Sequence, residues 1–138
     1  MYQRIMVPVD LAHVEQLTKA LTTGADLAKL YQIPVCYVGV TAALSGSVAH
    51  NPDEYDELLR NFTQDQKDSQ GLADVSSMTI LSNDPAVDLD DKLMQAAQDL
   101  GADLIVMASH KPGLIEHIFA SNAGYVASYS TVSVLVVR

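Results

Sequence analysis

The sequence predicts a single α/β domain over residues 1–138, with a doubly wound parallel sheet and helices on both faces. Short, continuous apolar runs alternate along the chain with segments of helical apolar periodicity. Continuous runs are typical of strands covered on two faces, and a strand-helix-strand order implies parallel pairing through right-handed crossovers. The 138 residues are close to the commonest domain size, 49% of them are hydrophobic, and no repeat or linker divides them.

One crossover occupies the start of the chain. Ile5–Val9 and Val35–Val40 are the apolar runs of two interior strands. Between them lies a helical pattern, although the glycine in Thr22–Gly24 weakens the turns expected at its middle. The apolar positions of this helix are Val14, Leu17, Leu21, Leu27 and Leu30.

A second helix is expected to begin after the connection Thr41–Asn51. Asn51 is its N-cap, Pro52 occupies the first turn, and Glu54 is placed to complete a capping box. An apolar stripe that packs on the sheet follows, made of Tyr55, Leu58, Leu59 and Phe62. The polar segment Thr63–Asp74 is either a solvated continuation of the helix or a frayed end.

Three further strands are expected in the second half of the chain. Met78–Leu81 is a weak candidate, Leu104–Ala108 is the clearest buried strand, and Ser133–Val137 closes the chain. The total is therefore five strands.

Two helices separate these three strands. The apolar pattern from Leu89 to Leu100 predicts the longer helix, which ends at Gly101 and has Asp88 as its candidate N-cap. A short helix is expected near Asn122–Ser128. The total is therefore four helices.

The composition excludes several classes of function. With 8 basic and 17 acidic residues, the net charge of −9 opposes binding to nucleic acid or to an anionic membrane. No apolar stretch approaches the ~20 residues that span a bilayer, and Met1–Asp10 lacks the pattern of an export signal. The single cysteine, Cys36, lies in an apolar run, so we expect a buried thiol and a reducing, cytoplasmic compartment.

The topology indicates where a ligand would bind. Open parallel sheets bind ligands beyond the carboxyl ends of their strands, where the strand order reverses. Two segments should flank that crevice, Pro8–Asp10 after the first strand and Ala108–Asn122 after the fourth. Asp10 has an ordinary alternative role as a cap of the following helix.

Three segments, in the right order and together spanning the chain, resemble the universal stress protein family. They are Arg4–Asp10, Gly101–His110 and Val134–Arg138. The resemblance implies a sheet of order 3-2-1-4-5 in a dimeric, cytoplasmic stress-response protein. It also implies binding of ATP or a related adenine nucleotide such as AMP, with Mg²⁺ as the accompanying ion; no other cofactor is expected.

The loop after the fourth strand departs from the family's nucleotide-binding pattern of glycine, two residues, glycine, about nine residues, glycine and Ser/Thr. Glycines let backbone N–H groups approach phosphates closely. The corresponding residues here are Ala108, Lys111 and Ala120, followed by Ser121, in a loop one residue shorter. The loop nevertheless resembles a subgroup with Ala-Ser-His-basic-Pro and Ser-Asn-Ala that can hold adenine nucleotide.

The resemblance also assigns roles to individual residues. Asp10 and Val40 would face the ribose and adenine, Ala108–Lys111 the ribose and phosphates, and Ala120–Asn122 the outer phosphates. The full set of expected nucleotide-binding residues is Pro8, Val9, Asp10, Val40, Met107, Ala108, His110, Lys111, Ala120, Ser121 and Asn122. Lys111 has the alternative of a solvated loop lysine, and Ser121 or Asn122 that of a helix cap.

Two functions stay open from the sequence. The first is a homodimeric stress-response protein that binds ATP, ADP or AMP, with at best slow ATP hydrolysis and no identifiable catalytic residue. The second is a dimeric interaction or regulatory module with a degenerate pocket. The missing glycines favour the second, whereas Asp10, Lys111 and the pair Ser121 and Asn122 favour the first. An enzyme for another small molecule, using the same crevice, is a weaker third.

Other enzyme classes lack their signatures. The chain has no Walker A sequence, no G-x-S-x-G elbow and no H-E-x-x-H helix. A phosphoacceptor receiver domain would need an acidic neighbour before Asp10, which is absent. His110 and His117 have no cysteine or acidic pair at ligand spacing, so no metal site is expected.

The last strand lies at the sheet edge in the implied order. Exposed apolar edges invite strand pairing, and two copies related by a two-fold axis would close this one. We therefore expect a homodimer, with coverage of the edge by a neighbouring helix as the alternative. The edge residues are Val132, Val134, Leu135 and Val136.

Overall fold

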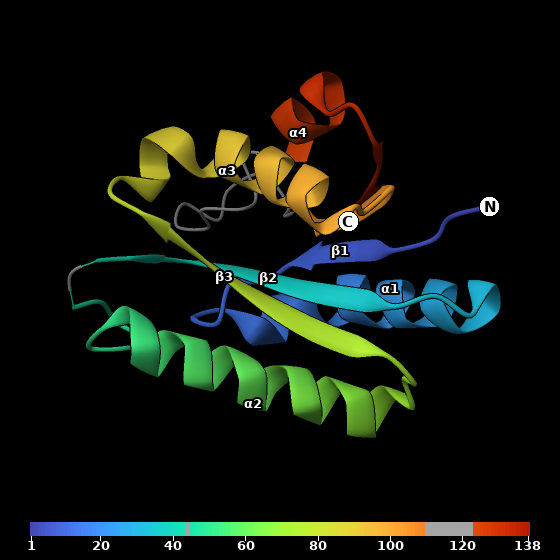
Figure 1. The fold of residues 1–138 in the computed structure, drawn as a ribbon, viewed down its shortest axis with the longest axis horizontal. Coiled ribbons are helices and arrows are strands. Elements are labelled where there is room, and N and C mark those ends of the chain that lie inside the picture. Colours follow the sequence, from blue (N-terminus) through green and yellow to red (C-terminus); the bar gives the residue numbers. More distant parts are fainter. Residues whose placement is uncertain (44, 110–122) are drawn as a thin grey trace.

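The computed structural model describes residues 1–43, 45–109 and 123–138, apart from the side chain of residue 86. Its five strands are all parallel, in the order β3-β2-β1-β4-β5 (Figure 1), which confirms the expected fold class. The strands are β1 (Ile5–Pro8), β2 (Val35–Ala42), β3 (Val75–Ser82), β4 (Leu104–Ala108) and β5 (Ser133–Val137). The helices are the 3-10 turn η1 (Val14–Leu17) and the α-helices α1 (Thr18–Tyr31), α2 (Pro52–Gln70), α3 (Pro85–Leu100) and α4 (Ala123–Tyr129).

Two layers of helices enclose the sheet. Helices α1 and α2 cover one face, and α3 and α4 cover the other (Figure 1). Successive residues of β1 point to opposite layers, because Ile5 and Val7 join the core with α1 and α2 while Met6 joins the core with α3. All three side chains are buried, which explains the continuous apolar run.

Helix α1 runs unbroken through Gly24, so the expected weakness at its middle is wrong. A Cβ on Gly24 would lie 3.2 Å from Val7 Cγ2 and 4.0 Å from the Val106 side chain. The helix therefore crosses close above β1 and β4, and its packing outweighs the about 1 kcal/mol that glycine costs inside a helix. Leu30, expected on the apolar face, is instead 72% exposed.

Helix α2 begins at the predicted cap. Asn51 Oδ1 accepts the Glu54 N–H at 2.8 Å. In a capping box the Glu54 carboxylate would accept the N–H of the N-cap residue, Asn51. Here it accepts the N–H of the preceding residue, His50, at 3.1 Å. The polar segment after the stripe is helical as far as Gln70, and the helix ends at Gly71 in the left-handed conformation, with φ +67°. The solvated continuation was therefore the correct alternative.

Strands β2 and β3 are longer than their apolar runs. Their registered pairs extend from Val35 with Val75 to Ala42 with Ser82. Thr41 and Ala42 were expected in a connection and lie instead in β2. Backbone pairing between the two strands extends the ladder past the point where the apolar signal ends.

Helix α3 begins at Pro85, with Asp84 as the N-cap residue, so the assignment of Asp88 as N-cap is wrong. The Asp88 carboxylate accepts the hydroxyl of Ser82, which is buried at the end of β3. The same Ser82 oxygen accepts the Asp84 N–H at 3.2 Å. Within the described ranges, no helix is long and apolar enough to cross a bilayer.

Strand β5 lies at the edge of the sheet and pairs with β4. Its side chains alternate, because Val134 and Val136 pack against the core with α3 and α4, as does Val132 before the strand. Leu135 points to the other face and is 38% exposed.

Candidate functional site

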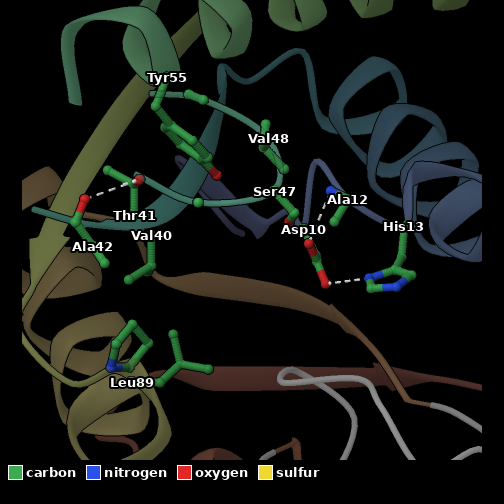
Figure 2. A pocket seen from close by; sticks show the side chains of 13 residues that line it. Asp10, Ala12, His13, Val40, Thr41, Ala42, Ser47, Val48, Tyr55 and Leu89 are labelled. Atoms are coloured by element: carbon green, nitrogen blue, oxygen red, sulfur yellow. Dashed lines mark hydrogen bonds and ion pairs between the residues drawn. The ribbon is translucent and has the colours of Figure 1, made fainter. Parts of the chain in front are cut away.

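A cavity of about 270 Å³ opens at the carboxyl ends of β1 and β2 (Figure 2). The strand order reverses between β1 and β4, so the cavity lies beside the topological switch point of the sheet, on its β1 side. Its described lining comes from the turn after β1, the end of β2, the loop before α2 and the first turns of α2 and α3. These residues are Asp10, Ala12, His13, Val40, Thr41, Ala42, Gly46, Ser47, Val48, Ala49, Tyr55, Pro85 and Leu89.

The Asp10 carboxylate is held at both of its oxygens. Oδ1 accepts the backbone N–H of Ala12 at 3.0 Å, and Oδ2 lies 2.9 Å from Nδ1 of His13 (Figure 2). A carboxylate can only accept, so Nδ1 is the donor in this hydrogen bond. The bond to Ala12 is an Asx-turn, which means that Asp10 caps the turn after β1 and not a helix. Each oxygen keeps lone-pair capacity for one further donor.

Tyr55 forms a second polar feature of the cavity and comes from α2. Its ring lies across Gly39, where a Cβ would overlap the hydroxyl and would lie 2.8 Å from Cε1. Burial of the ring, followed by the negative charge of Asp10, raises the pKa of the Tyr55 phenol. The hydroxyl is therefore a neutral group that can both donate and accept.

An apolar surface lies opposite these polar groups. Val40, Pro85 and Leu89 contribute it, and Figure 2 shows Val40 and Leu89 facing each other. Leu89 is 1% exposed and fixed in the core with α3. An apolar wall with a few convergent polar groups is typical of small-molecule sites.

The structure brings two of the predicted binding residues, Asp10 and Val40, into the lining of this one cavity. Pro8 and Met107 are buried in strands, Val9 is buried directly after β1, and none of the three belongs to the described lining.

The predicted phosphate-binding loop is described only at its beginning. Ala108 is half-buried at the end of β4, where it packs against the core with α1. The remaining predicted residues lie outside the described residues, and they are His110, Lys111, Ala120, Ser121 and Asn122.

Several lining residues were missed from the sequence. Tyr55 was assigned to an apolar stripe, which is correct for its ring but overlooks its hydroxyl. The loop residues Gly46–Ala49 were read as a connection, since small polar residues carry no distinctive signal. His13 could have been found, because it lies three residues after Asp10, the spacing at which a turn brings two side chains together.

The sequence model of the universal stress protein family matches residues 1–138. The chain belongs to this family. Among curated relatives, universal stress protein G of Shigella flexneri is 28% identical over 149 residues, with all of both chains covered. Universal stress protein G of Salmonella typhimurium is 26% identical over the same length, again with full coverage.

Solved structures of universal stress proteins share the fold. A universal stress protein from Archaeoglobus fulgidus superposes with a TM-score of 0.73 at 22% identity, and all of both chains are covered. A universal stress protein in complex with cAMP gives a TM-score of 0.69 at 20% identity, covering 99% of this chain and 97% of that one. The universal stress protein from Archaeoglobus fulgidus in complex with dAMP gives 0.69 at 21% identity, covering 99% and 98%.

In this universal stress protein the cavity offers three kinds of interaction. Asp10 accepts hydrogen bonds, Tyr55 can donate or accept one, and the apolar wall can contact a flat ring. The described residues contain no group of three or more His, Cys, Asp or Glu side chains that could hold a metal ion.

Proposed function

We propose that this universal stress protein binds an adenine nucleotide in the cavity at the carboxyl ends of β1 and β2, with the phosphates directed toward the end of β4. The observation that carries the proposal is that Asp10, fixed at both oxygens, shares one cavity with the apolar surface of Val40 and Leu89. A nucleoside has matching parts, because the flat faces of its base can pack against apolar side chains and its ribose carries hydroxyl donors.

The size of the cavity supports a small ligand. Small-molecule sites have volumes of about 300–1,000 Å³. The cavity of about 270 Å³ is just below that range, which suits the nucleoside part with the phosphates outside. Among the solved relatives, one is in complex with cAMP and one with dAMP, and both ligands are adenine nucleotides.

The phosphates contribute less to binding than the nucleoside. Ala108, Lys111 and Ala120 replace the three glycines of the phosphate-binding pattern, and the net charge of −9 repels phosphate. We therefore expect AMP to bind about as tightly as ATP. We also expect Mg²⁺ to add little affinity, because an ion in this site would be held mainly by the phosphates.

The biological role that follows is that of a homodimeric stress-response protein, acting as a nucleotide sensor with at best slow ATP hydrolysis. The dimer is proposed on the edge position of β5. The single domain and the cytoplasmic location stay predictions from the sequence. The missing glycines favour one other candidate, a dimeric interaction module that binds no nucleotide.

Calorimetric titration of the protein with AMP and with ATP, each with and without Mg²⁺, tests the proposal. Charged hydrogen bonds are worth about 1.5–3 kcal/mol, so Asp10→Ala should lower AMP affinity about 10- to 100-fold. Asp26→Ala is a matched control, because Asp26 is an exposed carboxylate on α1 paired with Lys29. If millimolar nucleotide produces no heat and no thermal shift, the result favours the interaction module. An Asp10→Ala variant that binds like the parent would remove Asp10 from the site.

A further inference from the structure

Tyr55 is a buried residue, and its hydroxyl has no hydrogen-bond partner among the described residues. The residue is only 5% exposed, yet it lines the cavity, and Figure 2 shows its hydroxyl directed toward Asp10 and Ser47. Because no described residue occupies its hydrogen-bonding capacity, this hydroxyl is available to a molecule in the cavity. A group in this position is suited to pair with a ligand in the cavity.

The neighbouring backbone accommodates the hydroxyl closely. Position 39 in β2 is glycine, and a Cβ there would overlap the Tyr55 hydroxyl and lie within 3.0 Å of Cζ. Gly39 directly precedes Val40 and Thr41, which line the cavity. The absence of a side chain at position 39 therefore allows Tyr55 to place its hydroxyl beside the ligand-facing end of β2.

The two polar groups of the cavity have complementary capacities. The Asp10 carboxylate only accepts hydrogen bonds, whereas the neutral Tyr55 hydroxyl can donate one. A ribose carries two adjacent hydroxyls, so one can donate to Asp10 while the other accepts from Tyr55. A sugar without these hydroxyls can form a hydrogen bond with neither Asp10 nor Tyr55.

We propose that the Tyr55 hydroxyl is a further ligand-binding group that donates a hydrogen bond to a sugar hydroxyl of the bound nucleotide and favours nucleotides whose sugar carries hydroxyls. The inference rests on the proposed function and deepens it, since it assigns a second ribose contact beside Asp10. It predicts that the protein prefers AMP to 2′,3′-dideoxy-AMP and that removing the Tyr55 hydroxyl abolishes part of this preference.

The experiment compares the affinities of AMP and 2′,3′-dideoxy-AMP for the wild type, Tyr55→Phe and Tyr37→Phe. Tyr37 is a matched control, because its hydroxyl also has no partner among the described residues, but it is buried away from the cavity. The Tyr37 ring packs against Phe62, with 5.6 Å between the ring centroids, and does not belong to the described lining. Tyr55→Phe should weaken AMP binding about 3- to 10-fold and leave dideoxy-AMP unchanged. Tyr37→Phe should change neither affinity.

Folding should not obscure the result. Phenylalanine keeps the buried ring and removes only a hydroxyl that no described residue pairs with, so we expect Tyr55→Phe to be about as stable as the parent. Gly39→Ala is a second variant that displaces the hydroxyl without removing it, and it should reduce the preference for AMP in the same direction.

The outcomes separate the inference from the proposed function. If the wild type binds AMP and Tyr55→Phe binds it equally well, the inference is wrong and the nucleotide site stands. An equal loss for AMP and dideoxy-AMP, or a loss in Tyr37→Phe as well, also overturns the inference. If the wild type binds no nucleotide, both the proposed function and the inference are wrong.

Discussion

Asp10 is oriented by two hydrogen bonds of different origin. One comes from the backbone of Ala12 in the turn after β1, and the other comes from the side chain of His13 at 2.9 Å. The backbone bond persists in any variant that keeps the turn. The contribution of His13 to ligand binding can therefore be separated from the turn itself by substitution.

The His13 variants give the first prediction. His13→Ala removes the donor to Oδ2, so the carboxylate can rotate, and we expect AMP affinity to fall about 3- to 10-fold. His13→Asn can present an amide N–H close to the position of Nδ1, and it should retain most of the affinity. Calorimetry with AMP measures both, and His50→Ala serves as a histidine control at an exposed position outside the cavity lining. Equal losses in the alanine and asparagine variants would contradict the positioning role.

The residue scale also explains what the sequence can predict of the site. Asp10 was identified because it lies at the end of an apolar run, where parallel strands present their ligand-binding edge, whereas Val40 was identified only through the family resemblance. Tyr55 was not identified, because its position in the helical apolar pattern predicts only a buried ring. The direction of its hydroxyl depends on the absence of a side chain at Gly39. Such a contact joins residues of two different elements, so no short sequence pattern predicts it.

Asp103 gives a prediction about pH. Burial tends to raise the pKa of its carboxyl, but backbone N–H groups of Arg4 and Gln3, at 3.0 to 3.1 Å, outweigh burial and hold the pKa below its ordinary value. A lowered folded-state pKa stabilises the protein above the unfolded pKa, and this contribution is lost as the pH falls through the folded value.

We therefore expect Asp103→Asn to lower the free energy of unfolding at pH 7. The variant should also lose less stability than the parent when the pH falls from about 4 to about 2. Urea unfolding at each pH measures the difference, with Asp26→Asn as the control. Stability curves of parent and variant that stay parallel across this range would rule out the role of Asp103.

At the scale of elements, the start of α2 connects stability to the site. The Asn51 side chain caps the helix, and the Asn51 carbonyl accepts the N–H of Tyr55 at 3.1 Å, so the cap lies one turn before the ring. Asn51→Ala should lower the free energy of unfolding by about 1 kcal/mol, whereas Asn51→Asp keeps the acceptor and should be nearly neutral. Urea unfolding midpoints measure both variants. An alanine variant as stable as the aspartate variant would show that the cap contributes nothing.

Element boundaries were predictable where their cause is local. Asn51 and the glycine after α3, Gly101, could be predicted because capping and left-handed conformations depend on a few adjacent residues. The start of α3 could not be predicted in this way, because the Asp88 carboxylate accepts a hydrogen bond from Ser82, which is a contact between a helix and a strand. The ends of β2 and β3 likewise depend on their mutual pairing.

At the scale of the whole molecule, the sheet order follows from crossovers that the sequence makes visible. Alternating apolar runs and helical patterns predict a parallel sheet, and the family resemblance supplies the order, which the structure confirms. The order places the cavity beside the switch point, on the β1 side, and leaves β3 and β5 as the two edges. The same topology thus determines both where a ligand can bind and where a second copy can pair.

The two edges allow a direct test of the proposed dimer. Leu135 on β5 is 38% exposed and Leu81 on β3 is 49% exposed, so the same substitution can be made on either edge with little effect on the core. Leu135→Lys places like charges close together across a two-fold axis at β5 and should convert the dimer to a monomer, while Leu81→Lys should leave it intact. Light scattering at high concentration measures the mass, which should be twice that of the chain for the parent and for Leu81→Lys. A monomeric parent would defeat the edge-pairing proposal, and a monomer only with Leu81→Lys would move the interface to β3.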